Sequence, residues 1–304
     1  MRSTLILAAC LLATSCNLIA GDNPSAPPAG TKRPAAPTGP PSTEPLKLKH
    51  TSGDALTVWA VPPAKSALEA LAADFRKLHK GGWNLSYLDR KALLDALKTE
   101  GAAPQVLIFA DAETAEALRS AGAIDVNTLR SFAGDTLVIV SRADANWATA
   151  SVFDLYELRF THLAIGDRAA TSAGYYAYQS LVSDGAWDRI KERIIELPSQ
   201  DELLQSLLVV KNHAVQERER GAAQIAVLLG SSAATTKGVK AFYAVPEDLH
   251  EPVRYQVAAA AGHANDPGVS TLLRLLAEDP DAQAKLASYG YLDRAAALKI
   301  ETPR

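Results

Sequence analysis

Short apolar runs alternate along most of the chain with segments whose apolar residues recur at the spacing of a helix. The run LTVWAV at 56–61 has the length and composition of a buried strand. The segment 65–80 that follows it places Leu68, Leu71 and Phe75 on one helical face. Strands are predicted in the same way at 56–61, 83–88, 105–110, 135–142, 162–166, 194–198, 224–230, 239–245 and 254–262. Such alternation is typical of α/β proteins with mostly parallel sheets.

The predicted helices divide the chain into two successive α/β sets. They cover 65–80, 90–101, 112–122, 173–183, 201–219, 268–278 and 281–289. Because long strands connect the sets, we expect two lobes, each a mostly parallel sheet flanked by helices, joined by two crossover strands. Lobe 1 is placed at about 54–139 plus 258–304, and lobe 2 at about 140–257. Ligands of such sheets bind beyond the carboxyl ends of the strands, so two facing lobes predict a cleft.

Residues 1–16 have the organisation of an export signal. Arg2 provides a positive start, 5–13 is an apolar stretch too short to cross a bilayer, and LATSC ends it with small residues. One interpretation is an ordinary secretory signal removed by cleavage. The other, which we favour, is a lipoprotein signal whose Cys16 becomes the acylated first residue. The sequence LAAC makes Cys10 the alternative lipid site.

A proline-rich segment separates this leader from the patterned region. Residues 23–45 hold eight prolines and almost no large apolar side chains. Such a composition cannot bury enough surface to offset ordering entropy, so 17–53 is predicted to be a disordered, semi-stiff tether. Both cysteines of the chain lie in the leader, which leaves residues 54–304 without a disulfide. We therefore expect an exported protein, anchored through Cys16 in the periplasm or at the cell surface.

Charge and residue pattern argue against several classes of function. A formal net charge of -3 on 304 residues gives no basic surface for nucleic acid or for an anionic membrane. The six histidines are scattered, with no pair at metal-ligand spacing. The sequence suggests no Ser/His/Asp or Cys/His arrangement and no phosphate-binding glycine loop. We therefore expect neither enzymatic activity nor a metal ion or other cofactor.

The stretch AIGDRAATSAGYYAYQSL at 164–181 is the most informative part of the chain. A buried strand ends at Gly166, small and hydroxylated residues follow, and a helix begins near residue 173. The first backbone N–H groups of a helix have no partner within it and favour anions. Ser172 either caps this helix or contributes to one wall of the cleft, and the two roles are compatible.

Five stretches resemble, in order, the periplasmic molybdate-binding proteins, which are substrate-binding components of ABC importers. They are TVWAVPPAKSALEALAADF (57–75), GAAPQVLIFADAETAEALRSAGAID (101–125), AIGDRAATSAGYYAYQSLVSDGAWDRIK (164–191), VPEDLHEPVRYQVAAAAG (245–262) and LLRLLAEDPDAQAKLASYGY (272–291). The resemblance covers residues 55–292 and implies an α/β, two-lobed periplasmic-binding-protein fold.

The same resemblance implies where a ligand would be held. The family binds a tetrahedral oxyanion with hydroxyls and backbone N–H groups. The hydroxyl positions fall here on Pro63, on the turn with Asp89 and Arg90, and on Leu229, so the ligand site is divergent. The backbone positions fall on Ala173 and near Asp201, at helix starts. The candidate ligand-binding residues are therefore Ala64, Lys65, Asp89, Arg90, Ser172, Ala173, Asp201 and Leu229.

Each candidate has a plainer interpretation beside the functional one. Asp89 and Arg90 are either a ligand-binding pair or an exposed ion pair that contributes little to stability. Lys65 either reaches the cleft or is solvated. Losing three charge-assisted hydrogen bonds would weaken oxyanion binding by roughly 1000-fold or more, and the carboxylate of Asp89 would repel an anion.

These observations predict a lipid-anchored, monomeric solute-binding protein of molybdate-binding type that delivers a small ligand to an ABC permease. The ligand is expected to be an anion, with molybdate, tungstate or another oxyanion as candidates. The protein would contact the membrane through its lipid anchor alone. The alternative is a lipoprotein that keeps the two-lobed scaffold without small-ligand transport and serves as a structural or partner-binding surface protein.

Overall fold

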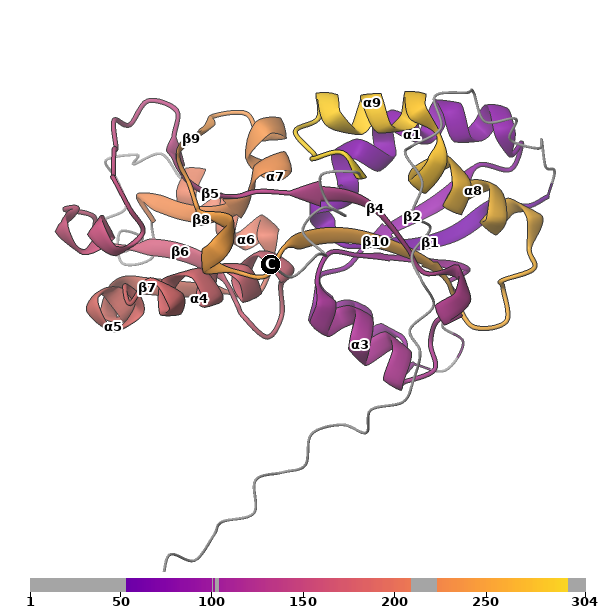
Figure 1. Cartoon of the computed structure of the whole chain (residues 1–304), viewed down its shortest axis with the longest axis horizontal. Coiled ribbons are helices and arrows are strands. Elements are labelled where there is room, and N and C mark those ends of the chain that lie inside the picture. The colour runs from indigo at the N-terminus through magenta and orange to yellow at the C-terminus, as the bar shows by residue number, and fades with distance from the viewer. Residues whose placement is uncertain (1–52, 100, 102–103, 209–222, 295–304) are drawn as a thin grey trace, which may run out of the picture. The chain divides into compact units, whose positions relative to one another are not determined.

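The computed structural model describes residues 53–99, 101, 104–208 and 223–294, all within one compact unit of the chain. The predicted leader, nearly all of the tether and the second half of the helix expected at 201–219 lie outside these residues. Two five-stranded sheets organise the described part of the chain (Figure 1).

The first sheet has the strand order β2-β1-β3-β10-β4. In that order the strands are Trp83–Tyr87, Leu56–Ala60, Val106–Phe109, Val253–Ala259 and Arg130–Asp135. β1 pairs in parallel with β2 and β3, while β10 is antiparallel to both of its neighbours. The helices of this lobe are α1 (Lys65–Leu78), α2 (Arg90–Ala96), α3 (Ala112–Ser120), α8 (Pro267–Glu278) and α9 (Pro280–Ser288).

The second sheet repeats this plan with the strand order β7-β6-β8-β5-β9. In that order the strands are Ile194–Leu197, Leu163–Gly166, Ile225–Leu229, Leu137–Arg142 and Val239–Ala244. β6 is parallel to β7 and β8, and β5 is the reversed strand. The helices of this lobe are α4 (Ser172–Ser183), α5 (Trp187–Ile190), α6 (Gln200–Leu208) and α7 (Gly230–Thr235).

The backbone passes between the two sheets twice. It leaves the first sheet at the end of β4 and enters the second as β5, with only Thr136 between them, and it returns between β9 and β10. Figure 1 shows both passages running side by side through the middle of the described residues. The expected α/β, two-lobed architecture with mostly parallel sheets and two crossovers is confirmed.

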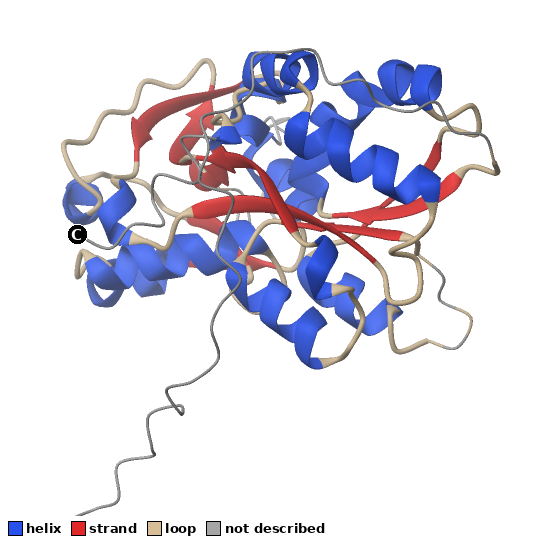
Figure 2. Ribbon diagram, turned by 45° about the vertical axis from the view of Figure 1, so that its right-hand side comes forward, coloured by secondary structure: helices blue, strands red, loops and turns tan. Residues whose placement is uncertain are grey.

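Local sequence explains why these segments fold as they do. β3 and β6 are buried at every position, which matches their continuous apolar runs. Asp111, Asp266 and Asp279 begin α3, α8 and α9, and each side chain accepts a hydrogen bond from a first-turn backbone N–H. Helices lie on both sides of the strands in Figure 2, so each sheet is covered on both faces.

One predicted element needs correction, and another is described only in part. The strand expected at 135–142 is two strands, because Arg130–Asp135 forms β4 in the first sheet and only Leu137–Arg142 forms β5. The segment RSFAGD has no apolar run, but β4 lies at the edge of its sheet, where continuous hydrophobicity is unnecessary. The helix expected at 201–219 is described as α6, Gln200–Leu208, and residues 209–219 lie outside the described residues.

Candidate functional site

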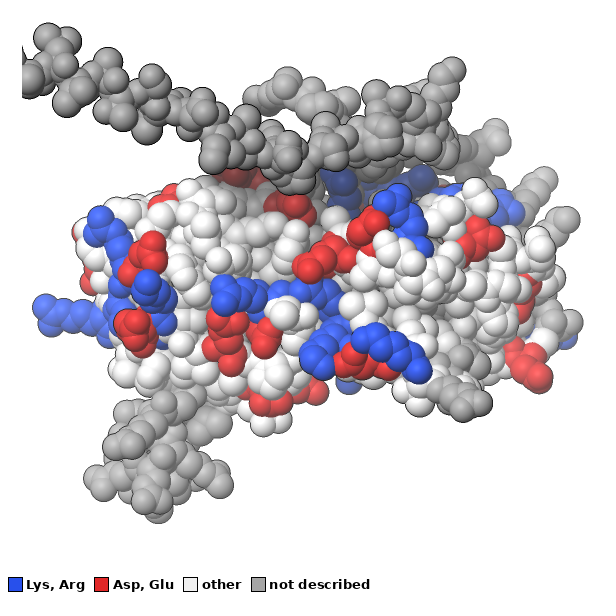
Figure 3. Space-filling model, turned by 90° about the horizontal axis from the view of Figure 1, so that it is seen from below, with Lys and Arg blue, Asp and Glu red and all other residues white. Residues whose placement is uncertain are grey.

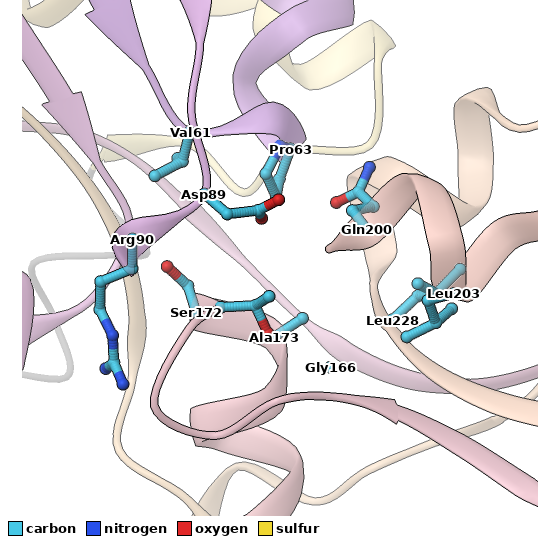
Figure 4. Close-up of a pocket in the computed structure, with 11 residues that line it drawn as sticks. Val61, Pro63, Asp89, Arg90, Gly166, Ser172, Ala173, Gln200, Leu203 and Leu228 are labelled. Atoms are coloured by element: carbon cyan, nitrogen blue, oxygen red, sulfur yellow. The ribbon is translucent and has the colours of Figure 1, made fainter. Parts of the chain in front are cut away.

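A small cavity lies between the two lobes. Its volume is about 10 Å³, which is room for about one water molecule. Most of the residues around it follow the carboxyl ends of β1, β2, β6 and β7, where ligands of α/β sheets bind. Figure 4 shows the lining side chains, which are Val61, Pro63, Asp89, Arg90, Gly166, Thr171, Ser172, Ala173, Gln200, Leu203 and Leu228.

The turn from β6 into α4 forms the second lobe's wall. Thr171 caps α4, since its hydroxyl oxygen accepts the backbone N–H of Gly174 at 3.0 Å. The suggested role of Ser172 as the cap is therefore wrong. Two glycines allow the strand and the helix to approach closely, because a Cβ on Gly174 would lie 2.1 Å from the carbonyl oxygen of Gly166. The turn thus places Ser172 and Ala173 at the cavity in the first turn of α4.

Two hydroxyl groups of α4 bind the first lobe. The hydroxyl of Ser172 donates to Oδ2 of Asp111 at 2.5 Å, and the other carboxylate oxygen of Asp111 accepts the Thr114 N–H at 2.7 Å. One turn further on, the hydroxyl of Tyr176 donates to the carbonyl oxygen of Ala110 at 2.9 Å. These side chains are buried, so the contacts are made out of water. The structure is therefore that of a closed cleft.

Arg90 connects the lobes a second time. Its guanidinium donates to the carbonyl oxygens of Arg168 at 2.5 Å and of Ala169 at 3.3 Å, both in the turn before α4. Within its own lobe it donates to the carboxylate of Glu113 at 2.7 Å. The Arg90 side chain is only 4% exposed, so these partners compensate a buried charge. Figure 4 shows the guanidinium pointing away from the carboxyl group of Asp89.

Unlike the guanidinium of Arg90, the side chain of Asp89 faces the cavity (Figure 4). It stands at the N-cap position of α2, but its side chain accepts no capping hydrogen bond from that helix. The Asp89 side chain instead lines the cavity and is directed toward Gln200, at the start of α6 in the other lobe (Figure 4). Burial raises the pKa of Asp89 to about 6; the Gln200 N–H opposes this rise, and the negative charges of Asp201 and Glu202 add to it.

The structure brings four of the predicted ligand-binding residues together around the cavity. They are Asp89, Arg90, Ser172 and Ala173. Of these, Arg90 lines the cavity while its guanidinium is engaged elsewhere.

The other four predicted residues, Ala64, Lys65, Asp201 and Leu229, do not line the cavity. Ala64 is buried beside it in a short 3-10 turn, Asp201 is exposed, and Leu229 is in the core, paired with β5. The ammonium of Lys65 lies 5.7 Å from the centre of the Tyr87 ring. In three cases the adjacent residue lines the cavity instead, namely Pro63, Gln200 and Leu228.

Sequence reasoning missed Gln200, Thr171, Leu203 and Asp111. Thr171 and Asp111 carried a usable signal, since each precedes a helical segment and is of a residue type that caps helices. Gln200 had no comparable signal, because what it supplies is a backbone N–H. Any residue type except proline offers that group.

Within the described part of the chain, the charged surface (Figure 3) and the remaining titratable groups suggest no second centre. Basic and acidic side chains are interspersed on the face seen in Figure 3, with no continuous field of one sign. Among the residues that the structure describes, no group of three or more His, Cys, Asp or Glu side chains is placed to hold a metal ion. None of the described helices combines the length and the apolar character needed to cross a membrane.

Known proteins with related sequences are molybdate-binding proteins. The molybdate-binding protein ModA of Escherichia coli K12 is 29% identical over 247 residues, which are 78% of this chain and 88% of that protein. The ModA of Haemophilus influenzae is 25% identical over 250 residues, which are 81% of this chain and 93% of that protein.

Solved structures with the same fold include the periplasmic molybdate-binding protein of Azotobacter vinelandii. It has a TM-score of 0.64 at 19% identity and covers 78% of this chain and 98% of its own. The family model of bacterial extracellular solute-binding proteins matches residues 56–292, which include both sheets and the cavity between them. The chain therefore belongs to the family of bacterial extracellular solute-binding proteins.

Proposed function

We propose that the protein captures a small anion outside the cytoplasm and delivers it to the permease of an ABC importer, as a solute-binding protein of molybdate-binding type. The observation that carries this proposal is the cavity enclosed by both lobes at the first turns of α4 and α6. The cavity lies where a ligand would be enclosed when two lobes close around it.

The chemistry of the cavity favours an anion. Helix N-termini present N–H groups and a positive end of the helix dipole, and Ser172, Ala173 and Gln200 belong to such first turns. With the guanidinium of Arg90 engaged by carbonyl and carboxylate oxygens, and the hydroxyl of Ser172 donating to Asp111, the anion would be held by backbone N–H groups. Hydrogen bonds of that kind to a charged group contribute about 1.5–3 kcal/mol each.

Binding would use the contacts that already join the lobes. The hydrogen bonds of Arg90 to the 168–169 turn and of Ser172 to Asp111 connect opposite lobes. They would form as the cleft closes, about the two crossings between the sheets. A permease would then recognise the closed arrangement, because only this arrangement fixes the surfaces of both lobes relative to each other.

The leader extends this proposal to the membrane. Cys16 would carry a lipid, and the proline-rich tether would keep the solute-binding domain within reach of a permease.

A calorimetric and thermal-shift screen of the purified protein tests the ligand class. Molybdate, tungstate, sulfate, phosphate and small carboxylates are titrated separately, and at least one anion is expected to bind and to raise the melting temperature. The variant Ala173→Asp, which places a carboxylate in the buried first turn of α4, should abolish that binding. The exposed Ala148→Asp serves as its control. If no anion binds, or if Ala173→Asp binds as well as its control, the proposal is wrong.

A further inference from the structure

Asp89 is an aspartate at a helix N-cap that does not cap its own helix. Aspartate is favoured at this position because its carboxylate usually accepts an N–H of the first turn. In α2 the side chain makes no such bond, whereas Asp111 at the start of α3 does. The Asp89 side chain turns instead toward Gln200 of the other lobe, as Figure 4 shows. Its role is therefore in the cleft.

The carboxylate of Asp89 occupies the α6 end of the cavity. α6 has a hydroxyl acceptor of its own, because the Glu202 N–H donates to the hydroxyl oxygen of Ser199 at 3.2 Å. Gln200, the first residue of α6, lines the cavity opposite Asp89, and its backbone N–H favours the ionised form of the Asp89 carboxylate. A backbone donor of the kind that would hold a solute anion already faces a negative charge from the protein itself.

That negative charge is weakly compensated. The neighbouring guanidinium of Arg90 is committed to Arg168, Ala169 and Glu113. The ionised groups that act on Asp89 from α6, Asp201 and Glu202, are themselves acidic. Burial strengthens the repulsion between Asp89 and an anion, because charges inside the cavity are screened less than charges in water.

We propose that Asp89 selects the ligand by charge, so that the cleft prefers a singly charged anion to a doubly charged anion of the same size and shape. This inference rests on the proposed function, since it assumes that the cleft takes anions. The helix starts attract both kinds of anion, but the second charge of a dianion meets the carboxylate of Asp89. At a separation of about 5 Å and an effective dielectric constant of about 20, that extra repulsion lowers affinity on the order of 100-fold.

Tungstate and perrhenate provide the test, because both are tetrahedral oxyanions of nearly equal size and only their charge differs. Calorimetry measures the affinity of each for the unmodified protein and for Asp89→Asn, which keeps the shape of the side chain and an oxygen acceptor for the Gln200 N–H. The control is Asp95→Asn on the same helix, where the exposed carboxylate pairs with Lys91 and Lys98.

The expected result is a change in selectivity. Asp89→Asn should raise the affinity for tungstate, relative to that for perrhenate, on the order of 100-fold, while Asp95→Asn leaves the ratio unchanged. If Asp89→Asn raises both affinities equally, the side chain only occupies space and charge selection is wrong. An unchanged ratio with measurable binding also overturns the inference and leaves the proposed function standing. If neither anion binds either protein, the inference is wrong, and the proposed function is wrong as well if no other anion of the screen binds.

Discussion

At the residue scale, Asp135 is a buried carboxylate with a structural role that sequence reasoning did not foresee. It accepts hydrogen bonds from the backbone N–H groups of Thr136 and Ser231 at 2.8 and 3.1 Å, and from the hydroxyls of Ser231 and Tyr255 at 2.5 and 3.1 Å. It ends β4 where the chain enters β5, and Tyr255 lies on β10. One carboxylate therefore connects the strands of both crossings.

Asp135 makes stability depend on pH. Burial raises its pKa from 3.8 to about 6, although its hydrogen bonds oppose the rise. Because the folded-state pKa is the higher one, the stabilisation is complete below about pH 4 and is lost as the pH rises through about 6. A shift of this size corresponds to about 3 kcal/mol.

Urea unfolding at pH 4.5 and pH 7.5 measures this prediction. The unmodified protein should be more stable at the lower pH, and Asp135→Asn should reduce the difference. Asp89, whose pKa is raised in the same direction, adds to the difference. Asp95→Asn is the control, since Lys91 and Lys98 lower the pKa of that exposed carboxylate to about 2. An Asp135→Asn protein with the same pH dependence as the unmodified one would contradict the assignment.

At the scale of elements, the turn before α4 and the start of α2 form one contact between the lobes. The guanidinium of Arg90 binds the carbonyl oxygens of Arg168 and Ala169, and the backbone N–H of Lys91 donates to the carbonyl oxygen of Ala170 at 3.1 Å. Three consecutive carbonyl groups thus have partners in the other lobe. These groups lie next to the cavity, so the contact and the ligand site depend on the same closure.

We predict that Arg90→Ala lowers the free energy of unfolding by about 3 kcal/mol, because it removes the hydrogen bonds of a buried guanidinium to two carbonyl oxygens of the other lobe and to Glu113. Denaturant unfolding measures this loss, and small-angle scattering should show a larger radius of gyration as the lobes separate. Arg119→Ala, which removes an exposed pair with Glu116, should change stability by less than about 1 kcal/mol. Equal losses in the two variants would refute a special role for Arg90.

At the scale of the whole molecule, a two-lobed domain follows a predicted export leader and a proline-rich segment. Neither the leader nor the tether up to residue 52 is among the described residues, so the anchor rests on sequence alone. The proline-rich composition predicts a reach of several nanometres for this segment, at roughly 3.1 Å per residue for an extended proline-rich chain.

Replacement of the anchoring cysteine tests this organisation. We expect Cys16→Ser to release the protein from the membrane fraction and to abolish labelling with a fatty acid, because a thiol is the site of acylation. Cys10→Ser is the matched control and should remain membrane-bound. If Cys10→Ser is the released variant, the lipid site is Cys10. If the unmodified protein takes up no label, the anchor does not exist.

Much of the fold followed from patterns within single segments. The strand 56–61 and the helix 65–80 were predictable because a buried strand and an amphipathic helix each have their own spacing of apolar residues. The turn at 164–181 was recognisable from its small residues, which the close approach of Gly166 and Gly174 requires. β4 was not predictable, since an edge strand of mixed composition has no such pattern.

The site depended on relations between segments that are distant in the chain. The sequence by itself determined that Asp89 and Arg90 follow a strand and begin a helix. Only the tertiary structure decided that Asp89 meets Gln200 in the cavity while Arg90 binds the turn before α4. It also decided that Leu228 and not Leu229 faces the cavity, because successive residues of a strand point to opposite faces. The secondary structure of a segment is encoded within a few residues, whereas the partners of a charged side chain depend on how the two lobes pack against each other.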